Sequence, residues 1–129
     1  DNSSVKGTLV KDDNAVYRII NEKNKTAALV RFNNKTAKKA VIPAVVKGYR
    51  GGKKISYQIT AVDTKAFAGC KNLKKIQIRS KQLRKIGKNA FRGIHRKAVF
   101  TLPSSCGKKY KKLFTAKTGY QKKTMKLKF

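Results

Sequence analysis

The sequence predicts a β-rich α+β fold, a short solenoid of stacked strand-and-turn units with a cap at each end. Two observations carry this prediction. Residues 60–102 contain a self-similar repeat with a period of 24 residues, and three short segments alternate apolar with polar residues. A fixed period in the twenties is typical of solenoids, and alternation with a period of two is typical of strands with one buried face. We expect one domain over residues 1–129.

The repeat consists of apolar residues and glycines that recur 24 positions apart, separated mostly by Lys, Arg, Asn and Gln. The matched pairs are Val62 and Ile86, Ala66 and Ala90, Phe67 and Phe91, Gly69 and Gly93, Ile76 and Phe100, and Ile78 and Leu102. Each glycine suits the left-handed end of a turn because it lacks a Cβ. We expect the two matched phenylalanines to stack in adjacent units, separated by roughly the 4.8 Å spacing of neighbouring strands.

The strands that close each unit are expected to point alternate residues toward the interior. These inward residues are Ala40 and Ile42, Ile76 and Ile78, and Phe100 and Leu102. The pattern assigns residues 39–103 to the solenoid. The first two strands are 36 residues apart instead of 24, and a hairpin insertion over 46–59, turning at Gly51-Gly52, accounts for the surplus.

The segments on either side of the repeat are predicted to be caps, because a solenoid needs atypical units to cover its ends. Residues 5–32 contain three strand-like runs, at 7–10, 15–20 and 26–32, and form the N-terminal β-hairpin cap. Residues 104–129 form a C-terminal helix-strand cap. Its helix should begin at Ser104 or Ser105 and end at Gly119, and its closing strand should turn Met125, Leu127 and Phe129 to one side.

Charge is the extreme feature of the composition. The chain carries 34 Lys and Arg against five Asp and Glu, for a formal net charge of +29. Such a charge favours polyanionic partners. The basic residues are mostly paired lysines, and lysine is a hydrated point charge without the planar fork that arginine offers to phosphate and guanine. The composition therefore indicates diffuse attraction rather than base-specific recognition.

Other classes of function lack a signal in the sequence. No run approaches the ~20 apolar residues that span a membrane, so we expect no membrane insertion. The N-terminus has no signal-peptide pattern, so either the protein is not exported or a signal has been removed. No nucleophile, acid–base pair, phosphate loop or metal-ligand set is evident, so we expect no catalytic, cofactor-binding or metal-binding residues and no cofactor.

The isolated titratable residues are expected to be structural. His95 is interpreted as an exposed loop residue, and Asp12 and Asp13 as part of a turn. Cys70 is expected to be a buried small apolar residue and Cys106 to be exposed. A disulfide between the two cysteines stays open.

Two segments resemble the BspA-type leucine-rich repeat, whose units carry I-G-x-x-A-F-x-G-C-x-x-L-x-x-I-x-I. They are KAFAGCKNLKKIQI at 65–78 and IGKNAFRGI at 86–94. The matching residues are Val62, Ala66, Phe67, Gly69, Cys70, Leu73, Ile76 and Ile78 in the first unit, and Ile86, Gly87, Ala90, Phe91 and Gly93 in the second. Asp63 replaces a glycine of the first unit, and Ile94 and Lys97 replace Cys and Leu in the second. These departures predict that the second unit merges into the C-terminal cap.

The resemblance implies a leucine-rich-repeat fold and a non-enzymatic protein that is extracellular or on the bacterial cell surface. The lysine-rich end is also similar to C-terminal modules of secreted proteins from Gram-positive gut bacteria. Family members are similar to adhesion modules, so the implied partners are proteins or anionic polysaccharides and cell-wall polymers. The alternative is a basic protein that binds nucleic acid, without sequence specificity. The isolated module is expected to be a monomer.

Candidate contact residues lie on one strand and on the hairpin. The outward strand positions are Lys75, Gln77 and Arg79, with Lys74 beside them. The alternative is a solvated strand face without a partner. On the hairpin the candidates are Tyr49, Arg50 and Tyr57. For the two tyrosines, as for Tyr120, the alternative is that the rings cover the hairpin and the cap.

Overall fold

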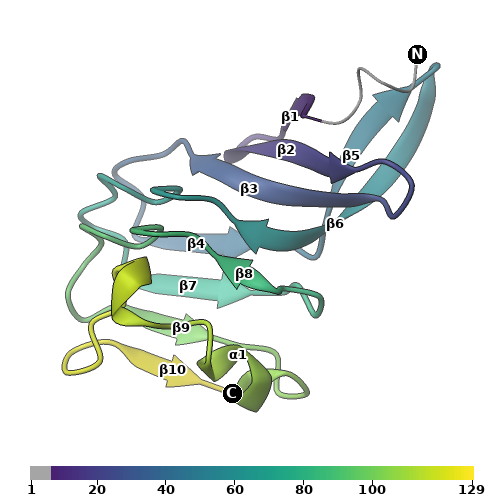
Figure 1. Ribbon diagram of the computed structural model, residues 1–129. Coiled ribbons are helices and arrows are strands. Elements are labelled where there is room, and N and C mark those ends of the chain that lie inside the picture. Colours follow the sequence, from purple (N-terminus) through teal and green to yellow (C-terminus); the bar gives the residue numbers. More distant parts are fainter. Residues whose placement is uncertain (1–6) are drawn as a thin grey trace.

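The computed structural model describes residues 7–129, which form two sheets with little helix (Figure 1). Its strands are β1 (Leu9–Lys11), β2 (Ala15–Asn21), β3 (Thr26–Phe32), β4 (Lys39–Ile42), β5 (Val45–Arg50), β6 (Lys53–Val62), β7 (Lys75–Ile78), β8 (Lys85–Ile86), β9 (Val99–Thr101) and β10 (Lys126–Lys128). Its helices are α1 (Gly107–Lys111) and the 3₁₀-helix η2 (Ala116–Thr118). The predicted β-rich character is confirmed.

The first sheet contains the N-terminal strands in the order β1-β2-β3-β6-β5, and β8 pairs in parallel with the end of β6. The predicted antiparallel pairing of β2 with β3 is confirmed. So is the hairpin of β5 and β6, in which Arg50 lies opposite Lys53 across the turn. Both turn glycines have positive φ, 57° at Gly51 and 78° at Gly52, as a two-residue hairpin turn of this twist requires.

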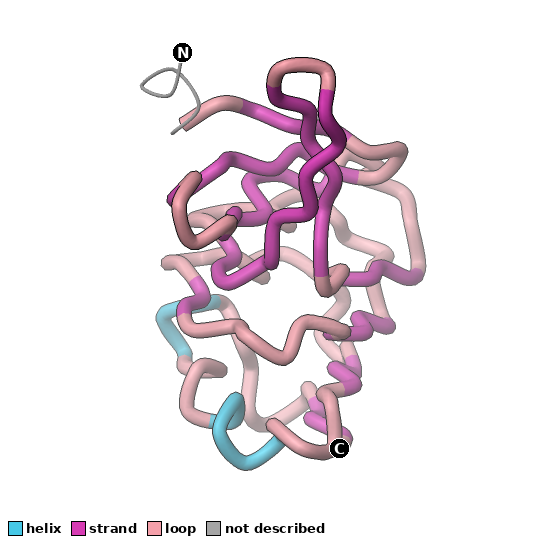
Figure 2. The backbone as a smooth tube through the Cα atoms, turned by 90° about the vertical axis from the view of Figure 1, so that its right-hand side faces the viewer, coloured by secondary structure: helices cyan, strands magenta, loops and turns pink. Residues whose placement is uncertain are grey.

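The second sheet has four parallel strands in the order β10-β9-β7-β4. The strands stack along one side of the molecule in the view of Figure 2, and both helices lie in its lower half. The expected inward alternation is confirmed. The six inward side chains are all buried, namely Ala40, Ile42, Ile76, Ile78, Phe100 and Leu102.

A row of stacked phenylalanine rings, here called the phenylalanine spine, joins the units through the interior. The ring centroids are 5.3 Å apart for Phe32 and Phe67, 5.4 Å for Phe67 and Phe91, and 5.9 Å for Phe91 and Phe114. The predicted stacking of Phe67 on Phe91 is confirmed. Phe32 and Phe114 extend the spine into the two flanking segments, which the 24-residue alignment did not reveal.

One backbone hydrogen bond recurs beside this spine from unit to unit. The N–H groups of Phe32, Phe67 and Phe91 donate to the carbonyls of Ala66, Ala90 and Thr118, at 2.9, 2.8 and 2.7 Å respectively. Aromatic packing and backbone pairing therefore link each unit to the next at equivalent positions.

The predicted C-terminal helix from Ser104 or Ser105 to Gly119 is wrong in its extent. α1 begins after Cys106, without a side-chain cap, and ends at Lys111. Two sets of tertiary contacts limit the length of the helix. The Tyr110 hydroxyl donates to the Ser80 carbonyl (2.7 Å) and accepts from the Leu83 N–H (2.9 Å). Farther on, the carbonyls of Lys117 and Thr118 must reach Asn89 and Phe91.

The end of the chain follows the expected pattern in part. Gly119 ends η2 with a φ of 92°, and an added Cβ would lie 2.4 Å from the Arg92 nitrogen. The predicted closing strand is β10, parallel to β9. Met125 is buried and Leu127 half-buried, whereas Phe129 is 54% exposed. The phenylalanine departs from the expected inward alternation because its ring lies against Gly107.

Candidate interaction face

The outward side of the parallel sheet carries side chains from all four strands in register. One row across the sheet is Lys39, Lys75, Val99 and Lys126. The next row is Val41, Gln77, Thr101 and Lys128. All are exposed except the half-buried Val99. We call these eight residues the sheet face.

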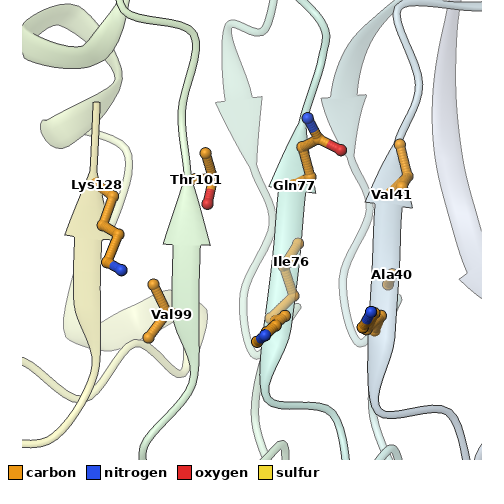
Figure 3. A pocket seen from close by; sticks show the side chains of 9 residues that line it. Ala40, Val41, Ile76, Gln77, Val99, Thr101 and Lys128 are labelled. Atoms are coloured by element: carbon orange, nitrogen blue, oxygen red, sulfur yellow. The ribbon is translucent and has the colours of Figure 1, made fainter.

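The sheet face is hollowed into a shallow depression of about 380 Å³ (Figure 3). It is lined by Lys39, Ala40, Val41, Lys75, Ile76, Gln77, Val99, Thr101 and Lys128. The floor mixes aliphatic, amide and hydroxyl groups, and the rim carries ammonium groups. Such a surface offers apolar contact at its centre and cationic contact around it.

A second depression, of about 370 Å³, adjoins the first where β4 and β7 begin. It is lined by Lys38, Lys39, Asn72, Lys74, Lys75 and His95. Lys39 and Lys75 border both depressions, so the two form one continuous surface. We call this second group of six residues the lysine edge.

The acids of the protein lie far from this surface in the chain. None of the five Asp and Glu occurs after Asp63, so residues 64–129 carry 21 Lys and Arg and no side-chain acid. Three acids are used in internal contacts. Asp63 pairs with Arg18 at 3.0 Å, Asp12 accepts from the Tyr17 hydroxyl at 2.8 Å, and Glu22 accepts from the Tyr57 hydroxyl at 2.6 Å. Within residues 7–129 the ion pair found is that of Arg18 with Asp63, so no ammonium group of either depression is paired with a carboxylate there.

One of these acids, Asp12, also affects the pKa of the tyrosine that it contacts. The pKa of the Tyr17 phenol is raised above its ordinary value by burial and, in addition, by its hydrogen bond and proximity to Asp12. The charged phenolate would be poorly solvated beside the carboxylate. Tyr17 therefore stays a neutral donor that holds the Asp12 turn.

The structure brings four of the predicted contact residues to one surface. Lys75 and Gln77 line the first depression and Lys74 the second. Arg79 is exposed directly after β7, and its N–H donates to the Ile42 carbonyl at 2.9 Å. Whether a partner contacts these residues stays a prediction.

The three candidate contact residues on the hairpin differ in their exposure. Tyr49 is 72% exposed, on β5 of the other sheet. The side chain of Arg50 lies outside the described part of the structure. Tyr57 is fully buried against the core, so its candidacy as a contact residue is wrong and the alternative, that its ring covers the hairpin, holds. Its alternation along β6 turns it inward, where Gly48 leaves room for the ring and the Glu22 carboxylate accepts a hydrogen bond from its hydroxyl.

Six residues of the sheet face were absent from the predicted contact set: Lys39, Val41, Val99, Thr101, Lys126 and Lys128. The first four could have been found, because they alternate with Ala40, Ile42, Phe100 and Leu102, which were expected to point inward. Lys126 and Lys128 depend on the parallel pairing of β10 with β9, which no local pattern indicates.

Other reactive side chains are dispersed. Cys70 and Cys106 are free, and Cys70 is buried, which raises the pKa of its thiol. His95 is half-buried and its Nδ1 accepts from the Lys97 N–H at 3.0 Å. Within residues 7–129 no three His, Cys, Asp or Glu side chains gather where they could hold a metal ion. No helix in that range is long and apolar enough to cross a membrane.

The stacked strand-and-turn units, each closed by a parallel strand and joined by a phenylalanine spine, define a leucine-rich-repeat fold. The chain belongs to the BspA-type leucine-rich repeat family, because the model of the BspA type leucine rich repeat region matches residues 53–128 in six copies. The match continues beyond residue 104, so the repeat reaches farther toward the C-terminus than the 24-residue alignment indicated. Repeats of this family are typically non-catalytic.

Three solved structures resemble this chain, and the first of them supports the fold. A leucine-rich repeat protein from Bacteroides capillosus is 20% identical, with a TM-score of 0.55 over 73% of this chain and 71% of that one. A leucine-rich repeat protein from T. pallidum is 20% identical (TM-score 0.48, covering 73% of this chain and 43% of that one). A leucine rich cell surface protein from Faecalibacterium prausnitzii is 19% identical (TM-score 0.42, covering 78% and 38%). No curated protein matches the chain.

Proposed function

We propose that the protein is a non-catalytic interaction or adhesion module of a bacterial surface or secreted protein. Its sheet face and lysine edge associate with anionic polymers or with acidic partner proteins. The units over 39–103 provide the scaffold, and the segments 5–32 and 104–129 cover its ends. Residues 5 and 6 of the first segment lie outside the described residues. We expect the isolated module to be monomeric.

One observation carries this proposal: the exposed side of the parallel sheet is cationic and has no acidic counterpart nearby. Exposed lysines repel one another, and a polyanion or an acidic protein relieves this repulsion while releasing its own counterions. The mixed floor of the first depression adds contacts that a protein surface can satisfy. Family membership supports a location outside the cell, since BspA-type proteins are often secreted or surface-bound.

A basic protein of this kind also attracts nucleic acid, which is the alternative function. Binding of single strands normally uses exposed aromatic rings on which bases stack. Here Phe67, Phe91 and Phe100 are fully buried, and the exposed Tyr49 lies on the other sheet. The ring of Phe129 is 54% exposed but lies against Gly107. The arrangement therefore favours non-specific attraction to nucleic acid over a dedicated site.

A salt titration separates these functions. Binding to heparin, teichoic acid, an acidic protein and DNA is measured from about 0.05 to 0.5 M NaCl, where screening removes exposed charge interactions. We expect at least one polymer or protein to remain bound when DNA has dissociated. Parallel loss of all four would mean that the charge acts only as a counterion-release surface, and tightest binding to DNA would favour the alternative.

A further inference from the structure

We propose that the lysine edge is a discrete site for tetrahedral oxyanions, the sulfate or phosphate esters of a linear glycan or polyol polymer. The inference deepens the proposed function and rests on it, because it names the ligand chemistry and the residues of one part of the face. It locates the polymer across the starts of β4 and β7, away from the centre of the sheet face.

The backbone positions two pairs of lysines side by side. Lys39 lies directly opposite Lys75 in the parallel pairing of β4 with β7. The carbonyl of Lys38 accepts from the N–H groups of Lys74 and Lys75, at 3.0 and 3.1 Å. Neighbouring strands are about 4.8 Å apart, so the ammonium groups on four flexible stems can converge on one anion.

These ammonium groups have no internal role that competes with a ligand. All four lysines are exposed, and the ion pair of Arg18 with Asp63 is the one found within residues 7–129. Their carbonyls and N–H groups, by contrast, are used in the sheet. The main chain is therefore fixed while the charges stay available.

Asn72 and His95 add neutral donors to the same depression. The Nδ1 atom of His95 accepts from the Lys97 N–H, so the neutral ring carries its proton on Nε2 and can donate from there. The amide of Asn72 supplies two further N–H groups. Donors arranged around a hollow suit a tetrahedral oxyanion, because its oxygens point in several directions and a carboxylate offers only two.

The surroundings favour a glycan or polyol over nucleic acid. None of the six residues of the lysine edge is Phe, Tyr, Trp or Arg, so the site offers a base only the single imidazole of His95 to stack on and offers guanine no planar fork. A sulfated glycan or a polyol phosphate needs neither. A sulfate ester and a phosphodiester present the same oxygens, and the experiment distinguishes them.

The test compares two variants of equal charge. In one, Lys38, Lys39, Lys74 and Lys75 are all changed to Gln. In the matched control, the exposed α1 residues Lys108, Lys109 and Lys111 and the exposed Lys112 directly after α1 are changed to Gln. The probes are a heparin octasaccharide, its desulfated form, an oligomer of glycerol phosphate, poly-glutamate and a single-stranded DNA, measured by calorimetry at several NaCl concentrations. Circular dichroism confirms that both variants are folded.

We expect the lysine-edge variant to bind heparin or glycerol phosphate about 10-fold or more weaker, with a log–log salt slope lower by about 3 units. The control should lose less than about 3-fold. His95→Ala should lose about 2- to 10-fold, as for one ordinary solvent-exposed hydrogen bond. Whichever of the two esters binds tighter identifies the source of the oxyanion.

Three results would overturn the site. They are equal losses in both variants, binding of poly-glutamate or desulfated heparin as tight as that of heparin, and tightest binding of DNA with the same lysine dependence. If the wild-type protein binds no polyanion and no acidic protein above background, the proposed function itself fails. Binding that both variants weaken equally leaves the proposed function standing and removes only this site.

Discussion

The parts of the chain before and after residue 63 handle charge in opposite ways. Residues 1–63 contain 13 Lys and Arg and all five acids, whereas residues 64–129 contain 21 Lys and Arg and no acid. In the first part Asp12, Glu22 and Asp63 each hold a neighbouring side chain. Residues 64–129 have no acidic side chain that could make such a contact. Their cations can be neutralised only by something outside the region.

This difference indicates what stabilises each part. The N-terminal sheet combines apolar burial with charge-assisted hydrogen bonds. The C-terminal units must resist the repulsion of 21 positive charges by apolar packing, backbone pairing and hydrogen bonds of neutral side chains such as Tyr110. Four substitutions, each with a control, test this difference between residues 1–63 and residues 64–129.

The largest effect is expected from Phe91→Ala, in the region without acids. Phe91 is fully buried and its ring contacts Phe67, Phe100 and Phe114. Loss of such a core ring should lower the free energy of unfolding by about 3–5 kcal/mol in urea denaturation. Tyr49→Ala, at a 72% exposed ring, is the control. Equal effects of the two substitutions would show that the spine does not stabilise this region.

Tyr110→Phe should cost less, about 1–3 kcal/mol of unfolding free energy, because it leaves the Leu83 N–H and the Ser80 carbonyl without their hydroxyl partner. The matched change is Tyr120→Phe, whose hydroxyl makes a longer bond of 3.3 Å to the Met125 carbonyl. Thermal unfolding of both variants measures the difference. A larger loss for Tyr120→Phe would contradict the anchoring role of Tyr110.

Asp63→Asn removes the carboxylate that pairs with Arg18 in the N-terminal part. The two side chains are 28% and 40% exposed, so the expected loss is about 0.5–1 kcal/mol, smaller in high salt. Asp13→Asn changes the net charge equally at an exposed residue. If the two variants lose the same stability, total charge matters and the ion pair does not.

The smallest effect is a gain. Lys122→Glu introduces an acid into the region that has none, and it should raise the unfolding free energy by about 0.3 kcal/mol at low salt. Lys23→Glu, also in an exposed turn but next to Glu22, should gain less. Denaturation in about 0.5 M NaCl should abolish the difference. A larger gain in unfolding free energy for Lys23→Glu than for Lys122→Glu would contradict the idea that residues 64–129 carry the greater repulsion.

The sequence predicted the repeat, its strands and their inward residues because glycine, phenylalanine and alternating aliphatic positions are local signals. It did not predict the ends of the spine. Phe32 and Phe114 lie in segments that do not follow the 24-residue period, so their stacking depends on tertiary contacts. The C-terminal helix was overestimated for the same reason, since Tyr110 and Thr118 are positioned by distant partners.

The candidate face was predicted in part. Lys75, Gln77 and Arg79 follow from alternation along one strand, and Lys74 is the sequence neighbour of the first. Their neighbours on β10 follow from strand order, which a single sequence does not encode locally. Tyr57 was misplaced because a tyrosine on a polar hairpin suits either side. Its inward direction follows from its alternation with Ile59 along β6 and from the room left at Gly48.

The recurring hydrogen bond beside the phenylalanine spine has a consequence for how such proteins change over time. Because the bond from each phenylalanine reaches the unit that follows, copying one 24-residue unit within a gene would supply its own ring, its own bond and its own outer strand. The lengthened protein would gain about 4.8 Å of binding surface with both ends unaltered. Duplication can therefore lengthen the parallel sheet and its outward surface without a change in any existing contact.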